Sequence, residues 1–416
     1  MIRETRIILK NAGRINPESI DDYLASGGYQ GLRKALAMEP VAIIDEILGS
    51  GLRGRGGAGF STGMKNRFTS QSCPTCPDHY LVVNADEGEP GTFKDRIIME
   101  NDPHLFIEGT VISARSIMAT KGYIYLRGEY TRAIELTRKA IEAAYQHGLL
   151  GKNILGSGFN FDLEIKLGAG SYLCGEELTL IESLEGKRGN PRIKPPFPAE
   201  KGLFGQPTLV NNVETLANIP SIIVNGKDWY RRFGSERSPG TKLFTISGKV
   251  KKPGCYEVEF GTTLRQLIFG LAGGMLSAYK PFKAALLGGA AGTFADSSML
   301  DERMTYDNLR EKGLTLGSGA VIVLEEGDQI AKVLLNCLRF FKHESCGKCV
   351  PCRVGTAILE NQAMELPLNK NTGRNQMEQM ILQAEIMAAT SLCPLGQSPI
   401  LPLKSAYQFF SSELAL

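Results

Sequence analysis

Apolar and polar positions in the first half of the chain predict a layered α/β unit. Strand-like patterns occur at 80–84, 123–126 and 161–167, and the first is a short apolar run typical of a buried strand. Amphipathic patterns with helical spacing occupy 1–48, 104–120, 130–147, 178–185 and a segment that starts near Asn211. Because strands and helices alternate, we expect helices packed on a sheet.

The pattern changes near Lys242. Apolar runs at 243–248 and 254–258 predict a hairpin, and a helical pattern at 263–271 and short strands at 286–287 and 320–324 follow. From Asp328 onward only helical periodicity remains. The sequence therefore predicts three units, at 1–241, 242–327 and 328–416.

A glycine-rich stretch, GSGLRGRGGAGFSTGMK at 49–65, is the first candidate for ligand binding. Dense glycine lets the main chain approach a ligand closely, and arginine or lysine beside exposed amides favours phosphate. The stretch lacks the Gly-Lys-Ser/Thr ending of a P-loop, and it is not a clean Rossmann fingerprint. It indicates a nucleotide loop of another kind, with a flexible basic loop as the alternative.

Cysteines form the second candidate site. Cys346, Cys349 and Cys352 stand in C-G-K-C-V-P-C, and Cys393 follows forty-one residues later. Four thiolates are the usual ligands of a [4Fe–4S] cluster. Zinc is the alternative, although its usual spacing is two C-x-x-C pairs, and free thiols are the third possibility.

A further C-x-x-C pair, Cys73 and Cys76, lies between prolines. We expect exposed loop thiols there, with a metal or cluster shared with a partner chain as the alternative. Cys174, Cys255 and Cys337 are expected to be small buried apolar residues.

Composition narrows the class of protein. The chain is 43% hydrophobic and 22% charged with a net charge of +3, so general attraction to nucleic acid or membrane is not indicated. No apolar run approaches the ~20 residues of a membrane span. The N-terminus lacks the features of a signal peptide, which predicts a cytoplasmic location.

Several long motifs, taken in order, resemble the NADH-binding flavoprotein (51 kDa) subunit of respiratory complex I and the related diaphorase subunits of NAD-linked hydrogenases and formate dehydrogenases. They are GLRGRGGAGF at 51–60, NADEGEPGTFKDR at 84–96, GAGSYLCGEE at 168–177, NPRIKPPFPA at 190–199, VNNVETLANIP at 210–220 and ESCGKCVPCR at 344–353, with the separate Cys393-Pro394. The resemblance covers nearly the whole chain.

The resemblance implies a fold, cofactors and partners. The expected fold is a Rossmann-like α/β domain for FMN and NADH, a small ubiquitin-like β-grasp module, and a C-terminal helical bundle that carries one [4Fe–4S] cluster. The expected partners are a 24 kDa-type [2Fe–2S] thioredoxin-like subunit and a larger iron–sulfur subunit, through which the chain would lie at the periphery of the inner membrane.

The resemblance also implies site residues. It places FMN near Gly54, Arg55, Gly56, Lys65, Asn84, Asp86, Glu87, Tyr172, Glu176, Asn211, Asn212 and Thr215. It places NADH against Phe60, Phe68, Glu89, Glu177, Lys194 and Phe197, with Glu89 and Glu177 as the acids of the reaction site. The chain departs from the family at Asn66, where relatives usually carry tryptophan, and we expect looser packing there.

The implied reaction is hydride transfer between NAD(H) and FMN, followed by one-electron transfer to the cluster. The parent enzyme stays open between quinone-reducing complex I, an NAD-linked and possibly electron-bifurcating hydrogenase, and a formate dehydrogenase. A scaffold that has lost nucleotide turnover is a further alternative, which the retained Lys65, Glu89 and Glu177 disfavour.

Overall fold

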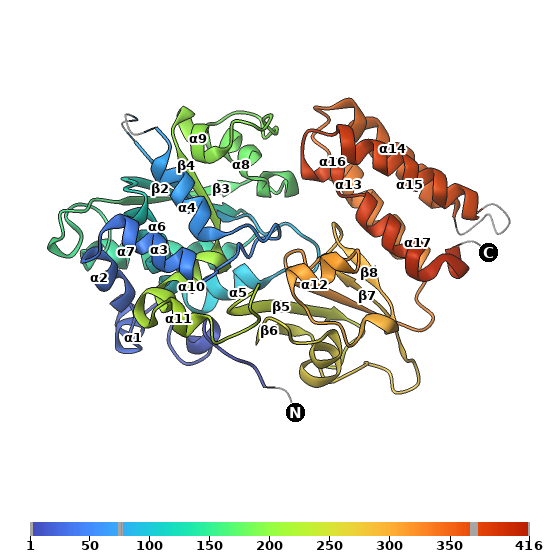
Figure 1. Cartoon of the computed structure of the whole chain (residues 1–416), viewed down its shortest axis with the longest axis horizontal. Helices are drawn as coiled ribbons and strands as arrows, with labels where there is room; N and C mark the ends of the chain where they lie inside the picture. Colours follow the sequence, from blue (N-terminus) through green and yellow to red (C-terminus); the bar gives the residue numbers. More distant parts are fainter. Residues whose placement is uncertain (1–2, 74–75, 77, 367–372, 415–416) are drawn as a thin grey trace.

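The computed structural model describes residues 3–73, 76, 78–366 and 373–414. It consists of an α/β unit, a smaller mixed sheet and a bundle of helices, which follow one another along the chain (Figure 1). No helix in the described ranges is long and apolar enough to cross a membrane.

The first sheet is parallel and has the order β3-β2-β1-β4. Its strands are β1 (Tyr80–Ala85), β2 (Lys121–Arg127), β3 (Asp162–Gly168) and β4 (Thr208–Asn212). The first three confirm the predicted strands. In the region of β4 the sequence predicts only the start of a helix. That helix does follow at once, because Asn212 caps α10 (Val213–Asn225) by accepting a hydrogen bond from Glu214 N.

Helices cover both faces of this sheet. Leu81 and Val83 of β1 point into the large core formed with α6 (Pro103–Ser116), α7 (Thr131–Gln146) and α10, whereas Val82 points into a smaller core with α8 (Glu177–Leu184). The remaining elements of this unit are η1 (Leu9–Asn11), α1 (Ile20–Ala25), α2 (Gln30–Leu36), α3 (Pro40–Gly49), α4 (Thr62–Gln71), α5 (Lys94–Asn101), η2 (Ile154–Gly156), η3 (Tyr172–Gly175), α9 (Pro198–Lys201), η4 (Leu203–Gly205) and α11 (Lys227–Tyr230).

The second sheet has the order β6-β5-β9-β7-β8 and mixes parallel and antiparallel pairs. Its strands are β5 (Thr241–Gly248), β6 (Gly254–Glu259), β7 (Phe282–Leu287), β8 (Thr293–Ala295) and β9 (Ala320–Glu325). The predicted hairpin is β5–β6, and the helical pattern at 263–271 becomes a π-helix, η5 (Gln266–Leu271). Two short helices, η6 (Ser297–Met299) and α12 (Tyr306–Glu311), complete the unit.

The last unit is helical, as the sequence predicts. It contains α13 (Ile330–Glu344), α14 (Val350–Glu365), α15 (Gly373–Thr390), α16 (Pro394–Gln397) and α17 (Ile400–Leu414). Their apolar faces share a core with residues of β7 and β9, such as Leu286 and Leu324, so the bundle packs on the second sheet (Figure 1).

Candidate functional site

A cavity of about 830 Å³ lies at the carboxyl ends of β1 and β4. The chain adds β2 and β3 on one side of β1 and then adds β4 on the other side of β1. The strand order therefore reverses between β1 and β4. Open α/β sheets bind ligands at such a switch point. Asn84, Asn211 and Asn212, which end these two strands, line the cavity.

The glycine-rich stretch forms one wall of this cavity through Gly54, Gly56, Gly57 and Gly59. Gly59 has φ +65°, and a Cβ there would lie 2.9 Å from the Tyr306 ring, so a larger residue is excluded. The Arg55 backbone N–H donates to Thr215 Oγ1 at 2.8 Å, which fastens the stretch to α10. The main chain therefore approaches the ligand space, as the sequence predicts for a nucleotide loop.

Three phenylalanines line the cavity, and about half of each side chain is exposed. Phe60 is 53% exposed, Phe68 is 47% exposed and Phe197 is 50% exposed. Apolar rings that are left open around a hollow favour a ligand with planar rings. The three side chains come from the glycine stretch, α4 and the residue before α9.

A series of ion pairs lines the cavity wall. Glu177 lies 3.0 Å from Lys65 Nζ and 2.9 Å from Lys194 Nζ. Burial raises the pKa of Glu177, but the two lysines outweigh it and hold that pKa at about 2. Glu177 is therefore ionised at neutral pH and fixes both lysines in the wall. Lys194 also contacts Glu176, whose carboxylate caps α8 by accepting from Leu178 N and Thr179 N.

Two buried polar atoms in the wall have no hydrogen-bond partner among the described residues. They are Asn211 Nδ2 and Thr62 Oγ1. A buried donor without an acceptor costs free energy of about 1–3 kcal/mol, so such atoms indicate a missing ligand. A donor amide and a hydroxyl beside a glycine-rich wall fit the oxygens and ring nitrogens of FMN.

Several residues that the resemblance assigns to FMN or NADH lie outside this cavity. Glu87, Glu89 and Tyr172 line a second cavity of about 460 Å³ together with Arg127 and Glu344. Tyr172 donates to Glu89 at 2.6 Å, and burial raises the pKa of Glu89 to about 6. The two acids expected in one reaction site, Glu89 and Glu177, therefore line different cavities.

The structure also shows the surroundings of Glu87 and Asp86. Glu87 accepts from Asp95 N and Arg96 N at the start of α5, and burial raises its pKa to about 7. Asp86 is buried, which raises its pKa to about 7 although Arg127 opposes the change. Its Oδ2 has no hydrogen-bond partner in the described part of the chain.

The Arg55 side chain, which the resemblance places near FMN, makes its hydrogen bonds outside the first cavity. Its guanidinium is fully buried, donates to Tyr230 OH at 3.0 Å and Pro239 O at 3.1 Å, and lies 4.6 Å from the centre of the Phe260 ring. These contacts join the first unit to the second. Only the backbone of Arg55 stays close to the cavity wall.

The first cavity also has lining residues that the sequence did not predict. Thr62, Gln71, Ser72 and Pro394 line it but were not expected there. The helical spacing of Thr62 from Lys65 and Phe68 could have indicated the first of them. Asn66 is fully buried and donates to Ser116 Oγ at 3.0 Å, while its Oδ1 has no hydrogen-bond partner among the described residues.

The four candidate cluster ligands lie at one end of the helical bundle. Cys352 and Cys393 are buried, and Cys346 and Cys349 are half-buried beside the same core. Backbone N–H groups of Leu395 and Gly396 hydrogen-bond the Cys393 thiol, although burial still raises its pKa to about 11. Ser345 Oγ lies 3.2 Å from Cys352 Sγ.

Four cysteines are the donor set that a [4Fe–4S] cluster uses. Within the described ranges, no three His, Cys, Asp or Glu side chains converge as ligands of one ion. In a [4Fe–4S] cluster each thiolate binds a different iron, so the sulfurs surround the cluster without converging on one point. Lys348, which lies between Cys346 and Cys349 in the sequence, donates to Pro191 O at 2.9 Å.

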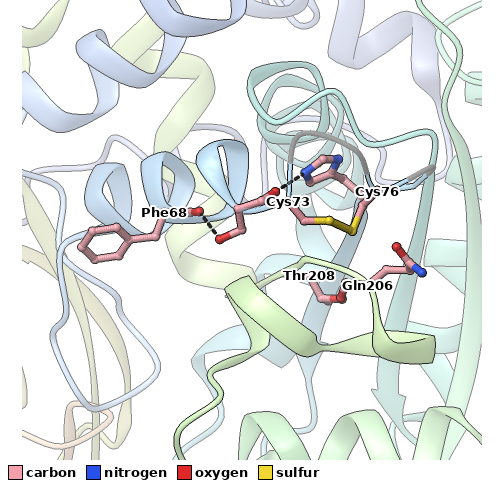
Figure 2. The surroundings of a disulfide bond; sticks show 7 residues. Phe68, Cys73, Cys76, Gln206 and Thr208 are labelled. Carbon is pink, nitrogen blue, oxygen red and sulfur yellow. Dashed lines mark hydrogen bonds between the residues drawn. A yellow bond between two sulfur atoms is a disulfide. The ribbon is translucent and has the colours of Figure 1, made fainter.

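The expectation of free thiols at Cys73 and Cys76 is wrong. The two residues form a disulfide, with Cα atoms 5.3 Å apart (Figure 2). Their backbone positions fall within the range that a disulfide requires. Of the other cysteines, Cys174 and Cys337 are buried as expected, and Cys255 is half-buried.

Comparisons with known proteins agree with this geometry. Residues 47–221 match the Nuo51 FMN-binding domain, 243–291 match the SLBB domain, and 332–415 match the NADH-ubiquinone oxidoreductase-F iron-sulfur binding region. The chain thus carries an FMN-binding domain and a 4Fe–4S-binding region, and the expected β-grasp module is an SLBB domain.

Relatives of two kinds match over nearly the whole chain. An NADH-quinone oxidoreductase subunit of Aquifex aeolicus is 50% identical over 94% of this chain and 89% of its own length. The HndC subunit of the NADP-reducing hydrogenase of Solidesulfovibrio fructosivorans is 45% identical over 99% of this chain and 83% of its own length.

A solved structure shares the fold. The crystal structure of NAD⁺-reducing [NiFe]-hydrogenase in the H2-reduced state superposes with a TM-score of 0.86 at 34% identity. The match covers 99% of this chain and 66% of that chain. The chain belongs to the family of NADH-oxidising FMN and 4Fe–4S subunits that serve NADH-quinone oxidoreductases and related hydrogenases.

Proposed function

We propose that this chain oxidises a reduced nicotinamide nucleotide in the first cavity and passes the electrons to a cluster held by Cys346, Cys349, Cys352 and Cys393. The observation that carries the proposal is the position of Pro394, which lines the cavity and directly follows Cys393. The ligand space and the cluster site thus meet at one peptide bond, and electron transfer requires such proximity.

The chain's own side chains bind and orient the ligands. We assign Asn211 and Thr62 to FMN, because both present buried polar atoms that lack a protein partner in the described ranges. The glycine wall admits the flavin and its phosphate, with Lys65 as the nearby cation. When bound there, FMN would supply the hydride acceptor for NADH and the one-electron donor for the cluster.

The nucleotide is assigned to the phenylalanine side of the cavity. Phe60, Phe68 and Phe197 offer faces for its rings, and Lys194 and Glu177 offer hydrogen bonds to its polar groups. Glu177 holds both lysines in place rather than transferring a proton, since its pKa of about 2 keeps it ionised. We assign Glu89 a positioning role through Tyr172 in the second cavity.

Partners and location follow from the family. The chain is part of a multi-subunit enzyme, and we propose a 24 kDa-type [2Fe–2S] thioredoxin-like subunit and a larger iron–sulfur subunit as its neighbours. Through them it would lie in the cytoplasm at the periphery of a membrane complex. Both a quinone-reducing and a hydrogenase parent are supported, because relatives of both kinds match over at least nine-tenths of the chain.

The test is an anaerobic titration of the purified chain with NADH after FMN and iron have been assayed. We expect the flavin absorbance to bleach while the EPR signal of a reduced cluster appears. FMN and iron that are both present but do not respond to NADH would refute the proposal in favour of a cluster-bearing scaffold.

A matched pair of variants locates the nucleotide. Phe197→Leu should raise the KM for NADH severalfold, because an exposed ring of the cavity is lost. Phe204→Leu is the control. Phe204 follows Phe197 closely in the sequence and is 55% exposed, but it lies outside the cavity. Equal effects of the two substitutions would contradict the assignment. Hydrogen-dependent or quinone-dependent activity of the complex purified from its source would identify the parent enzyme.

A further inference from the structure

The Cys73–Cys76 disulfide lies at the edge of the first cavity. It directly follows α4, and the two residues before it, Gln71 and Ser72, line the cavity wall. The same helix carries Lys65 and Phe68 into the wall. A change at the disulfide therefore acts on the end of the helix that contacts the ligand space.

The last turn of α4 is tied to the segment that leads into β1. Ser72 donates to Phe68 O twice, from its backbone N at 3.0 Å and from its Oγ at 2.7 Å. His79, the residue before β1, places Nε2 at 3.4 Å from Ser72 O (Figure 2). The disulfide lies between these two points in the chain.

The chemistry of the pair favours exchange over a permanent crosslink. Only three positions separate the cysteines, so the bond closes a very short loop and restricts the unfolded chain little. Both residues are half-buried, which leaves access for a thiolate. A C-x-x-C disulfide of this kind is typical of thiol–disulfide exchange, and in a reducing compartment disulfides are usually transient.

Gln206 is a polar side chain near the disulfide. Figure 2 shows Gln206 and Thr208 on the segment drawn below the disulfide. Gln206 Oε1 is buried and has no hydrogen-bond partner among the described residues. A disulfide has no S–H to donate, whereas a thiol does, so reduction supplies the class of donor that Gln206 lacks.

We propose that Cys73–Cys76 is a thiol–disulfide exchange site whose substrate is a protein dithiol, and that its reduction loosens α4 and weakens nucleotide binding. The exchange balances. One thiolate of the dithiol attacks a sulfur of the disulfide, forms a mixed disulfide and releases the other cysteine as a thiolate. The second thiolate then displaces the remaining cysteine, so the dithiol loses two electrons and Cys73 and Cys76 each end as a thiol.

The experiment equilibrates the purified holoprotein with mixtures of reduced and oxidised thioredoxin, a protein dithiol. Differential alkylation and mass spectrometry then measure the oxidised fraction of the pair. We expect a reversible two-electron transition. Hydrogen–deuterium exchange of peptides that cover 65–72 should become faster on reduction, and the Kd for NADH should rise about threefold to tenfold.

A double variant, Cys73→Ser with Cys76→Ser, is the control for effects of the dithiol on the cluster or on other cysteines. It should resemble the reduced protein and should not respond to thioredoxin. The effect on NADH rests on the proposed function, whereas the exchange and the hydrogen–deuterium measurements do not. Failure to bind NADH in either state would therefore refute the proposed function, and the α4 peptides would still decide the inference.

Two results would overturn the inference. A pair that stays oxidised across the thioredoxin mixtures is a structural crosslink. A pair that is reduced without any change in hydrogen exchange at 65–72 is not coupled to α4.

Discussion

The strongest prediction concerns the charge of Glu177. We expect Glu177→Gln, which keeps the shape of the side chain, to increase the preference for a nucleotide with an additional phosphate. Lys65 and Lys194 lose their shared partner in this variant, so the cavity gains one net positive charge. NADPH carries an additional negative phosphate and should benefit more than NADH.

The magnitude follows from the structure. The pKa of Glu177 falls from 4.5 to about 2, which corresponds to about 3 kcal/mol of favourable interaction with the ionised carboxylate. Both lysines are 30% exposed, so solvent screening reduces the usable part to about 1–2 kcal/mol. A change of about 1.4 kcal/mol is tenfold in affinity, and we expect the NADPH to NADH ratio of kcat/KM to rise by roughly that factor.

The assay compares kcat/KM for both nucleotides with an artificial electron acceptor at low and high salt. The gain for NADPH should shrink at high salt, because ions screen the new charge. Glu200→Gln is the control. Glu200 lines the same cavity, but its carboxylate accepts from Phe197 N at 3.0 Å instead of pairing with these lysines. An unchanged ratio in Glu177→Gln, or an equal change in Glu200→Gln, would refute the reasoning.

Three further predictions test the other assignments. Arg55→Lys should destabilise the protein by about 2 kcal/mol in thermal unfolding, because the hydrogen bonds of the guanidinium are lost, while the folded fraction keeps its FMN. Loss of FMN at unchanged stability would indicate instead that the Arg55 side chain binds the phosphate. Cys352→Ser should lose cluster iron and its EPR signal, whereas Cys337→Ser, in the same core, should keep both. Glu89→Gln should flatten the change of melting temperature between pH 4.5 and 6. The raised pKa of Glu89 gives a stabilisation that is complete below pH 4.5 and lost as pH rises to about 6, and an unchanged profile in the variant would contradict it.

Much of the fold could be predicted because local patterns agree with the tertiary structure. The strands β1 and β2 lie inside the sheet and are buried along most of their length, which gives apolar runs. The edge strand β3 alternates apolar and polar residues instead, and only Leu163 in it is buried. β4 was missed because it is only five residues long and ends in the Asn211-Asn212 pair that precedes α10. At that point a strand end and a helix cap share the same residues.

The candidate site was predictable as a set of motifs but not as a geometry. Glu89 and Glu177 are equivalent in a list of acidic residues, yet packing places one beside Tyr172 and the other between two lysines. Likewise, the spacing of Cys73 and Cys76 is the same for free thiols, a metal site and a disulfide. Only the bond between the two sulfurs in the structure distinguishes these outcomes.

The link between the cavity and the cluster site depends on contacts that join distant parts of the chain. The Tyr172 backbone N–H donates to Glu344 at 3.0 Å, its ring packs on Phe340, and Lys348 donates to Pro191 O. These contacts lie just before and within the segment with three cluster cysteines and hold it against the first unit. Because Pro394 reaches the cavity from the same bundle, a shift of the bundle would move the cluster ligands and the cavity wall together. The helical unit thus completes the cavity as well as holding the cluster.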